Sequence, residues 1–176
     1  MKTASWRFFL ALWPDAAARA ARAGHALRWG WPDAARPYGE SDWHVTLQFL
    51  GALPRDRLSE LRAGLRVGSE PFELRLDRAE LWSRGLAVLG CSEVPAALQQ
   101  LHDALAGALT GLGLSPETRR YLPHLTLARS ASGARLPPEF PAISWTVRGY
   151  ALVRSTGDAR WRYDLLQQYR FDPCPS

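Results

Sequence analysis

The sequence predicts an α+β protein of two pseudo-symmetric lobes, each an antiparallel sheet backed by helices, with a groove between them for the active site. Two observations predict this fold. The tetrapeptide at residues 44–47, His-Val-Thr-Leu, recurs as His-Leu-Thr-Leu at residues 124–127. The expected order of elements is strand, helix, strand, helix, hairpin, helix, strand, hairpin, which gives each half one strand with the repeated motif. We therefore expect a single bilobal domain over residues 1–176.

The first half of the chain is expected to form two strands and two helices. An aromatic and apolar run, Trp-Arg-Phe-Phe-Leu-Ala-Leu, is typical of a buried strand, and Pro14 before an alanine-rich stretch is typical of a helix start. Leu58, Leu61 and Leu65 have the spacing of an amphipathic helix. The expected elements are a strand over 6–12, a helix over 15–27, a loop over 30–39, a strand over 43–50 and a helix over 54–65.

The second half is expected to add two hairpins around a long helix. Phe72, Leu74 and Leu76 alternate with charged residues, which predicts one strand that turns back at a Ser-Arg-Gly segment into a second strand. Leucines at spacings of three and four predict the longest helix, and two glycines end it. The expected elements are strands over 72–82 and 86–89, a helix over 94–112, and strands over 122–128, 143–154 and 161–171.

The composition indicates a folded and basic protein. Hydrophobic residues make up 47% of the chain and eight are tryptophan, which excludes a disordered chain. The net charge of +5 comes almost entirely from arginine, because Lys2 is the only lysine. Arginine binds phosphate through paired hydrogen bonds, so this bias fits a nucleic-acid partner, although a GC-rich genome would enrich arginine together with alanine, glycine and proline.

Several classes of protein are disfavoured. The chain shows neither a transmembrane stretch nor a signal-peptide pattern, so we expect a cytoplasmic protein that does not enter a membrane. We also expect a monomer. Cys91 and Cys174 are too few and too far apart for a disulfide framework or a CxxC metal site. No Cys, Asp or Glu stands at ligand spacing within either motif, although Glu40 and Asp42 precede the first, so zinc is disfavoured. We expect no cofactor, and the G-x-S-x-G pattern of many serine hydrolases does not occur.

The repeated motif predicts a pair of displayed histidines. Side chains on a strand alternate between the two faces of the sheet. The polar face is expected to carry His44, Thr46 and Gln48 in the first copy, and His124 and Thr126 in the second, while Phe49 joins the apolar face. The two other histidines, His25 and His102, lie in helical stretches without a following threonine, and we interpret both as helix residues without chemistry.

Two histidines that face one groove suit acid–base chemistry on a phosphate ester. Imidazole titrates near neutrality, so one ring can be neutral while the other carries a proton. A threonine hydroxyl two residues from each histidine can bind the non-bridging oxygens of the phosphate, and Arg129 can add a charge-assisted contact. Strand alternation places Arg129 on the opposite face unless the strand ends or bulges at Ala128. The competing interpretation is that both motifs are ordinary strands with half-buried histidines.

These motifs and their flanks resemble a known family. Paired His-x-Thr-apolar motifs, one in each lobe, are the mark of the 2H phosphoesterase superfamily. The segment 7–14 resembles the first strand of its bacterial RNA 2′,3′-cyclic phosphodiesterases, also called 2′-5′ RNA ligases. The segments 43–51 and 120–129 resemble their two motifs, with the trailing Phe-Leu-Gly of the first and the terminal arginine of the second. Ser155 followed by Tyr163 resembles their closing hairpin.

The resemblance implies a bilobal 2H phosphoesterase domain that hydrolyses RNA 2′,3′-cyclic phosphate ends to 2′-phosphomonoesters without a metal. It implies that His124 is the general base, that His44 is the general acid, and that Thr46 and Thr126 bind the phosphate. An RNA with a 2′,3′-cyclic phosphate end is then the partner, and reversal of the reaction would join it to a 5′-hydroxyl in a 2′-5′ bond.

Three points stay open on the sequence alone. Phe8 or Phe9 on the first strand is a candidate for stacking on the terminal base, although both fit a core position as well. A relative with the same motifs could act on small cyclic nucleotides or on ADP-ribose cyclic phosphate. A protein that binds RNA ends without turning them over would carry the same basic composition.

Overall fold

Ten strands and three α-helices form the part of the chain described by the computed structural model, residues 4–171, so that Cys174 lies outside it. The strands are β1 (Ser5–Leu12), β2 (Arg36–Pro37), β3 (Val45–Pro54), β4 (Phe72–Leu76), β5 (Arg78–Trp82), β6 (Leu86–Gly90), β7 (His124–Arg129), β8 (Ile143–Val147), β9 (Gly149–Ser155) and β10 (Tyr163–Arg170). The helices are α1 (Ala16–Ala26), α2 (Leu58–Gly64) and α3 (Ala96–Gly111). None of the helices in this range is long and apolar enough to cross a membrane.

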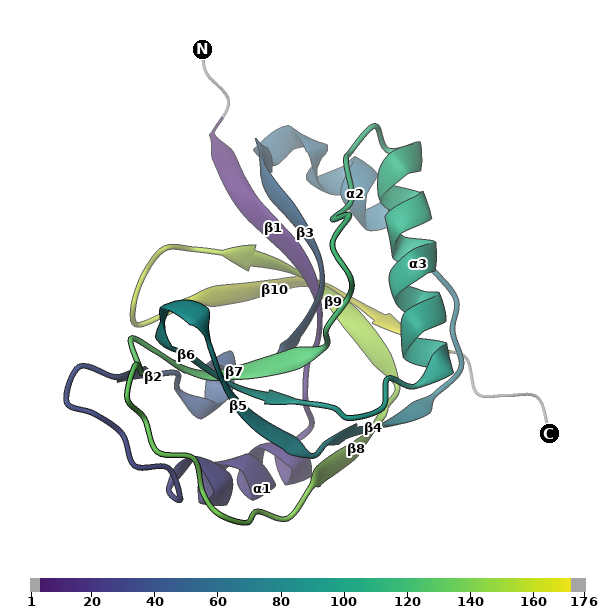
Figure 1. Cartoon of the computed structure of the whole chain (residues 1–176). Helices are drawn as coiled ribbons and strands as arrows, with labels where there is room; N and C mark the ends of the chain where they lie inside the picture. The colour runs from purple at the N-terminus through teal and green to yellow at the C-terminus, as the bar shows by residue number, and fades with distance from the viewer. Residues whose placement is uncertain (1–3, 172–176) are drawn as a thin grey trace.

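One antiparallel sheet of eight strands runs through both halves of the chain, and its two parts meet at the motif strands β3 and β7 (Figure 1). The first has the order β10-β9-β1-β3 and the second the order β7-β6-β5. β3 and β7 pair only at Val45 opposite Leu125, and the short β2 pairs with the end of β7 instead. Because the two motif strands touch at one point and then diverge, the residues on either side of that point face each other across an opening. The predicted fold class, α+β with an antiparallel sheet in each lobe, is confirmed.

The helices cover the sheets with their apolar faces. Asp15 caps α1 by accepting a hydrogen bond from the Ala18 amide at 2.8 Å, and α1 packs against β8. α3 packs against β3 and against α2, and the two helices lie side by side in Figure 1. The leucines that predict α3 are all buried, namely Leu98, Leu101, Leu105 and Leu109.

Two predicted strands are each divided in the structure. The segment 72–82 forms β4, which pairs with β8 in a separate sheet, and β5, which pairs with β6. The break is at Asp77, whose side chain accepts hydrogen bonds from Ser92 while its amide donates to Gly90. The predicted strand over 143–154 divides into β8 and β9 before Gly149, where a Cβ would collide with the backbone of β10.

Element ends also differ from the prediction. β3 begins at Val45 and continues through Gly51 to Pro54, and β7 begins at His124 itself. The helix expected over 54–65 starts as a 3-10 turn at 55–57, which leaves α2 with 7 residues.

Candidate active site

Both motif strands carry a β-bulge at the same position of the repeat. Between β1 and β3, Leu10 pairs with Gln48 and Ala11 with Thr46, so Leu47 has no partner. Between β6 and β7, Ala87 pairs with Ala128 and Val88 with Thr126, so Leu127 has no partner. The leucine of each His-x-Thr-Leu copy is therefore the extra residue of a bulge. The two copies of the motif share the same backbone bulge as well as the same sequence.

The bulges correct two predictions that rested on strict alternation. After Leu47 the alternation reverses, so Gln48 turns into the interior with 1% of its surface exposed, and Phe49 reaches the motif face with 63% exposed. After Leu127 the same reversal brings Arg129 to the face of Thr126. Arg129 therefore lines the site because the strand bulges, as the sequence analysis required. The bulge is at Leu127, one residue before Ala128.

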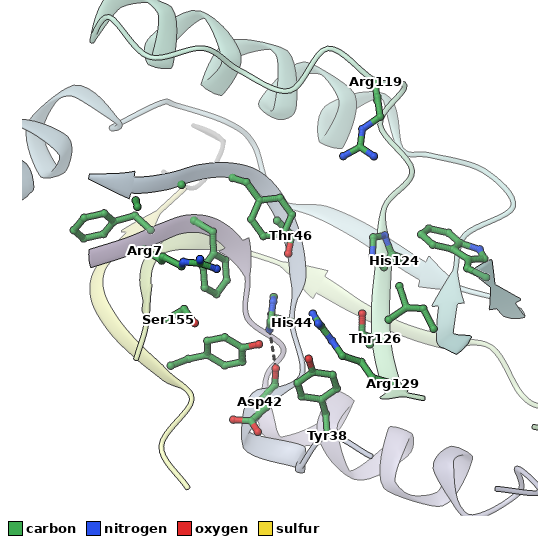
Figure 2. Close-up of a pocket in the computed structure, with 18 residues that line it drawn as sticks. Arg7, Tyr38, Asp42, His44, Thr46, Arg119, His124, Thr126, Arg129 and Ser155 are labelled. Atoms are coloured by element: carbon green, nitrogen blue, oxygen red, sulfur yellow. Dashed lines mark hydrogen bonds between the residues drawn. The ribbon is translucent and has the colours of Figure 1, made fainter. Parts of the chain in front are cut away.

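A cavity of about 740 Å³ lies over the divergence of β3 and β7. Figure 2 shows His44 and Thr46 on one side of it and His124 and Thr126 on the other, with the guanidinium of Arg129 reaching between them. Residues without a predicted role also line it, namely Arg7, Tyr38, Asp42, Phe49, Trp82, Arg119 and Tyr163, together with Ser155. Within residues 4–171, no three His, Cys, Asp or Glu side chains are grouped as metal ligands.

The two histidines are held in the same tautomer by the same local contact. The Nδ1–H of His44 donates to the carbonyl of Asp42 at 2.7 Å, and the Nδ1–H of His124 donates to the carbonyl of Leu122 at 2.8 Å. A carbonyl oxygen only accepts, so Nδ1 carries the proton in both rings. Each neutral ring is left with an unprotonated Nε2 as its second nitrogen, which is the state a general base requires.

Each histidine also packs against a tryptophan. The Trp13 ring is stacked on His44 at 5.2 Å between centroids with an interplanar angle of 4°, and the Tyr163 ring meets His44 edge-on at 4.9 Å. The Trp82 ring lies 4.4 Å from His124, and its indole N–H donates to Glu80 at 2.6 Å. These rings fix the orientation of the imidazoles, a role that the sequence pattern does not reveal.

Burial favours the neutral form of both histidines. Removal from water is the main cause that lowers the pKa of His44 to about 4, and the nearby His124 also lowers it. The hydrogen bond to the Asp42 carbonyl acts in the opposite direction and raises the pKa. Burial also lowers the pKa of His124, but its hydrogen bond to Leu122 and the negative charge of Glu80 act in the opposite direction. The carboxylate of Asp42 is paired with Arg162 at 3.2 Å instead of with His44.

Four side chains that could bind a phosphate are available to a ligand. Among the described residues, the hydroxyls of Thr46 and Thr126 have no hydrogen-bond partner, and neither Arg7 nor Arg129 has an ion-pair partner. Arg129 lies 5.8 Å above the Tyr38 ring, whereas Arg119 is paired with Glu117 at 2.6 Å. The cavity therefore offers two hydroxyl donors and two unpaired guanidinium groups to an anion.

Phe8 and Phe9 are core residues at the base of this cavity. Their exposed fractions are 1% and 4%, and the Phe9 ring packs against His44 at 5.0 Å. Both rings line the cavity but expose almost none of their surface, which favours the core interpretation, so stacking by Phe8 or Phe9 stays a prediction. Phe49 is the exposed ring in the cavity, 6.2 Å from Phe9.

One hydrogen bond from the second lobe ties the first motif in place. The hydroxyl of Tyr121, three residues before His124, donates to the carbonyl of Thr46 at 3.1 Å. The Tyr121 ring stacks on His102 at 4.1 Å, and His102 in turn bonds the Gln48 side chain at 3.0 Å. His102 therefore supports the spacing of the two motif strands, although it does not line the main cavity.

His25 and His44 make the stability of the fold depend on pH. Burial, followed by the charge of Arg28, lowers the pKa of His25 from 6.5 to about 4, and the pKa of His44 is lowered to about 4 as well. The unfolded chain binds protons at these rings near pH 6.5, while the folded chain does not. We expect the free energy of unfolding to fall between pH 6.5 and 4, by about 1.4 kcal/mol per pH unit for each histidine.

Urea unfolding at pH 7, 5.5 and 4.5 measures this dependence. His25→Gln removes one group whose pKa is lowered by folding, so its unfolding free energy is expected to fall less steeply with acid than that of the unaltered protein. Equal slopes would contradict the assignment of His25.

Similar sequences are found among known proteins. The sequence pattern of the 2′-5′ RNA ligase superfamily matches residues 13–159. The RNA 2′,3′-cyclic phosphodiesterase of Escherichia coli K12 is 34% identical over 145 residues, which cover 78% of this chain and 81% of that protein. The protein of the same name from Thermus thermophilus is 30% identical over 139 residues, covering 72% of this chain and 68% of that protein.

Solved structures share the fold over nearly the whole chain. A crystal structure of a phosphoesterase superposes with a TM-score of 0.83 at 29% identity, covering 96% of this chain and 99% of that one. The E. coli LigT structure complexed with NADP+ superposes with a TM-score of 0.82 at 30% identity and the same coverage. The family pattern spans most of the chain, and the E. coli relative is 34% identical with 81% of its length covered, so this chain belongs to the 2′-5′ RNA ligase superfamily.

Proposed function

We propose that this protein hydrolyses RNA 2′,3′-cyclic phosphate ends to 2′-phosphomonoesters without a metal. One observation carries the proposal: two histidines from matched motifs, held in the same tautomer, line a single cavity with two uncommitted threonine hydroxyls. The names of the E. coli and Thermus relatives, and an E. coli LigT structure complexed with 3′-AMP, support a ribonucleotide end as the ligand.

In this proposal His124 is the general base and His44 the general acid. His124 takes a proton from water, and Glu80 stabilises the imidazolium that forms. His44 donates a proton to the leaving 3′ oxygen. Because the pKa of His44 is low in the empty site, it must take up this proton when the phosphodiester anion binds beside it.

Thr46 and Thr126 are proposed to bind the non-bridging oxygens of the phosphate, with Arg129 as a charged donor between them. Donors from both lobes would hold the phosphorus between the two imidazoles. The unpaired Arg7, at the β1 side of the cavity, would meet the RNA backbone.

We expect Phe49, rather than Phe8 or Phe9, to stack on the base of the cyclic nucleotide. Stacking of a base on an aromatic ring is worth about 1–3 kcal/mol. Phe49→Ala is therefore expected to raise KM roughly tenfold with kcat little changed. Steady-state kinetics on a short cyclic-phosphate RNA measure the effect, and Phe49→Tyr is the matched control that keeps the ring. An unchanged KM in the alanine variant would exclude this stacking.

Turnover of an RNA oligonucleotide with a 2′,3′-cyclic phosphate end tests the function. We expect hydrolysis at the same rate with and without EDTA, and a higher kcat/KM than for a 2′,3′-cyclic mononucleotide or ADP-ribose cyclic phosphate. Preference for either small substrate would support the alternative enzyme. Tight binding of RNA ends without any product would support a binding protein.

We also propose that the whole chain acts as one catalytic domain and as a monomer in the cytoplasm. Both histidines, both threonines and Arg129 come from a single chain, so the site needs no second copy. Light scattering of the purified protein tests the monomer, and fractionation of cells tests the location.

A further inference from the structure

A second cavity lies behind Trp13 and has no part in the proposed hydrolysis. Its volume is about 340 Å³, within the range of small-molecule sites, and it shares no residue with the main cavity that holds the two catalytic histidines. Trp13 lines the second cavity, whereas His44, on which the Trp13 ring is stacked, lines the main one. A molecule in the second cavity is therefore separated from the proposed acid by a single aromatic ring.

Two arginines give the second cavity a positive charge. Arg148 lies between β8 and β9, Arg170 ends β10, and both are exposed. Within residues 4–171, neither guanidinium has an ion pair or a hydrogen bond, and the side-chain amide of Gln168 has no partner either. Asp15 is the one acid in the lining, and its carboxylate accepts a hydrogen bond from the Ala18 amide at 2.8 Å. The cavity therefore offers two guanidinium groups and an amide to an anion.

The same cavity offers apolar surface to a planar ring. Trp13 is partly exposed, and Leu165 on β10 is 38% exposed. An aromatic side chain can stack on any nucleobase, and guanidinium groups bind phosphate through paired hydrogen bonds. An indole ring beside two free guanidinium groups is a combination that suits a nucleotide.

We propose that the second cavity binds a nucleotide, with its phosphate at Arg148 and Arg170 and its base on Trp13, and that the bound nucleotide raises the turnover of the cyclic phosphate. The effect on turnover rests on the proposed function, whereas the binding itself does not. Two sources supply this ligand chemistry. One is a free nucleotide, and the other is a nucleotide of the substrate RNA upstream of its cyclic end.

Trp13 connects the second cavity to His44. The two rings are parallel within 4° at 5.2 Å between centroids, so a ligand that packs on Trp13 also restricts the motion of the imidazole. The negative charge of a nucleotide behind Trp13 favours the protonated form of His44, which the proposed acid step requires. Both effects act in the direction of faster turnover.

Turnover of a 2′,3′-cyclic mononucleotide in the presence of 5′-AMP tests the first source, because this substrate has no second nucleotide. 5′-AMP in the main cavity competes with the substrate and raises KM alone, whereas 5′-AMP in the second cavity changes kcat. We expect kcat to rise roughly fivefold, the lower end of the usual coupling between two sites. Arg148→Glu should abolish this rise without changing kcat in the absence of 5′-AMP, and Arg148→Lys should retain most of it. Arg28→Glu, a reversal of an exposed charge outside both cavities, is the matched control.

A series of cyclic-phosphate RNAs of increasing length tests the second source. If the RNA itself fills the second cavity, kcat/KM rises once the chain is long enough to reach it. Arg148→Glu should then lower kcat/KM of the long RNAs roughly tenfold, because a hydrogen bond to a charged group is lost, and leave that of the cyclic mononucleotide unchanged. A rise of kcat with 5′-AMP identifies a free nucleotide, and a gain with length that depends on Arg148 identifies the RNA chain. The absence of both would overturn the effect on turnover.

Calorimetry measures binding without turnover and so separates this inference from the proposed function. The probes are 5′-AMP and a short RNA that ends in a 3′-hydroxyl. Compared with Arg148→Glu, the unaltered protein is expected to bind one more equivalent of 5′-AMP or to bind the RNA more tightly. Equal stoichiometry and equal affinity of the two proteins for both probes would overturn the inference. Failure of the proposed function would look different, because cyclic phosphate would stay intact in every variant while the difference in binding persisted.

Discussion

His44→Ala and His124→Ala are each expected to lower kcat by roughly 10²–10⁴-fold, the usual contribution of a positioned acid or base. Each ring is fixed by an Nδ1–H bond to the carbonyl two residues earlier, so that Nε2 is the nitrogen available for proton transfer. Alanine removes that nitrogen and leaves the rest of the cavity lining in place. Single-turnover rates on a cyclic-phosphate RNA measure the effect directly.

His25→Gln is the control for these variants, because His25 lies outside the cavity. Its activity is expected to equal that of the unaltered protein at pH 7. Circular dichroism confirms that the alanine variants fold. Full activity in either folded alanine variant would refute the two-histidine mechanism.

Thr46→Val and Thr126→Val are expected to lower kcat roughly 10- to 100-fold each, because a hydrogen bond to a charged group contributes about 1.5–3 kcal/mol. Valine has nearly the shape of threonine, and the described residues place no hydrogen-bond partner on either hydroxyl, so the fold should not suffer. Thermal unfolding checks the fold and steady-state kinetics the activity. Thr110→Val, on the exposed face of α3, is the matched control. Wild-type kcat in both variants would remove the threonines from phosphate binding.

The sequence alone places the histidines and threonines because their signal is local and repeated. A histidine and a threonine two residues apart share a face of any extended strand, and two copies in one chain predict that these faces meet. Strict alternation would place Arg129 on the opposite face of the strand, so only the structure, with its bulge at Leu127, shows that Arg129 shares the face of Thr126.

What sequence reasoning missed depends on neighbours that are distant along the chain. The bulges at Leu47 and Leu127 are set by how these strands pair with β1 and β6, and no residue type marks them. Phe49 and Gln48 exchange faces for this reason. Trp13 and Trp82 acquire their role only when the fold brings them against the histidines. In the same way, the segment 72–82 has the alternation of one strand, but its two halves find different partners.

The assignment of acid and base is tested most directly by a substrate whose leaving group needs no acid. Replacing the 3′ oxygen of the cyclic phosphate by sulfur gives a thiolate, which departs without protonation. We predict that His44→Ala regains most of its activity on this substrate, while His124→Ala stays as impaired as on the oxygen substrate. Equal impairment of both variants on sulfur, or recovery of His124→Ala instead, would contradict the assigned roles.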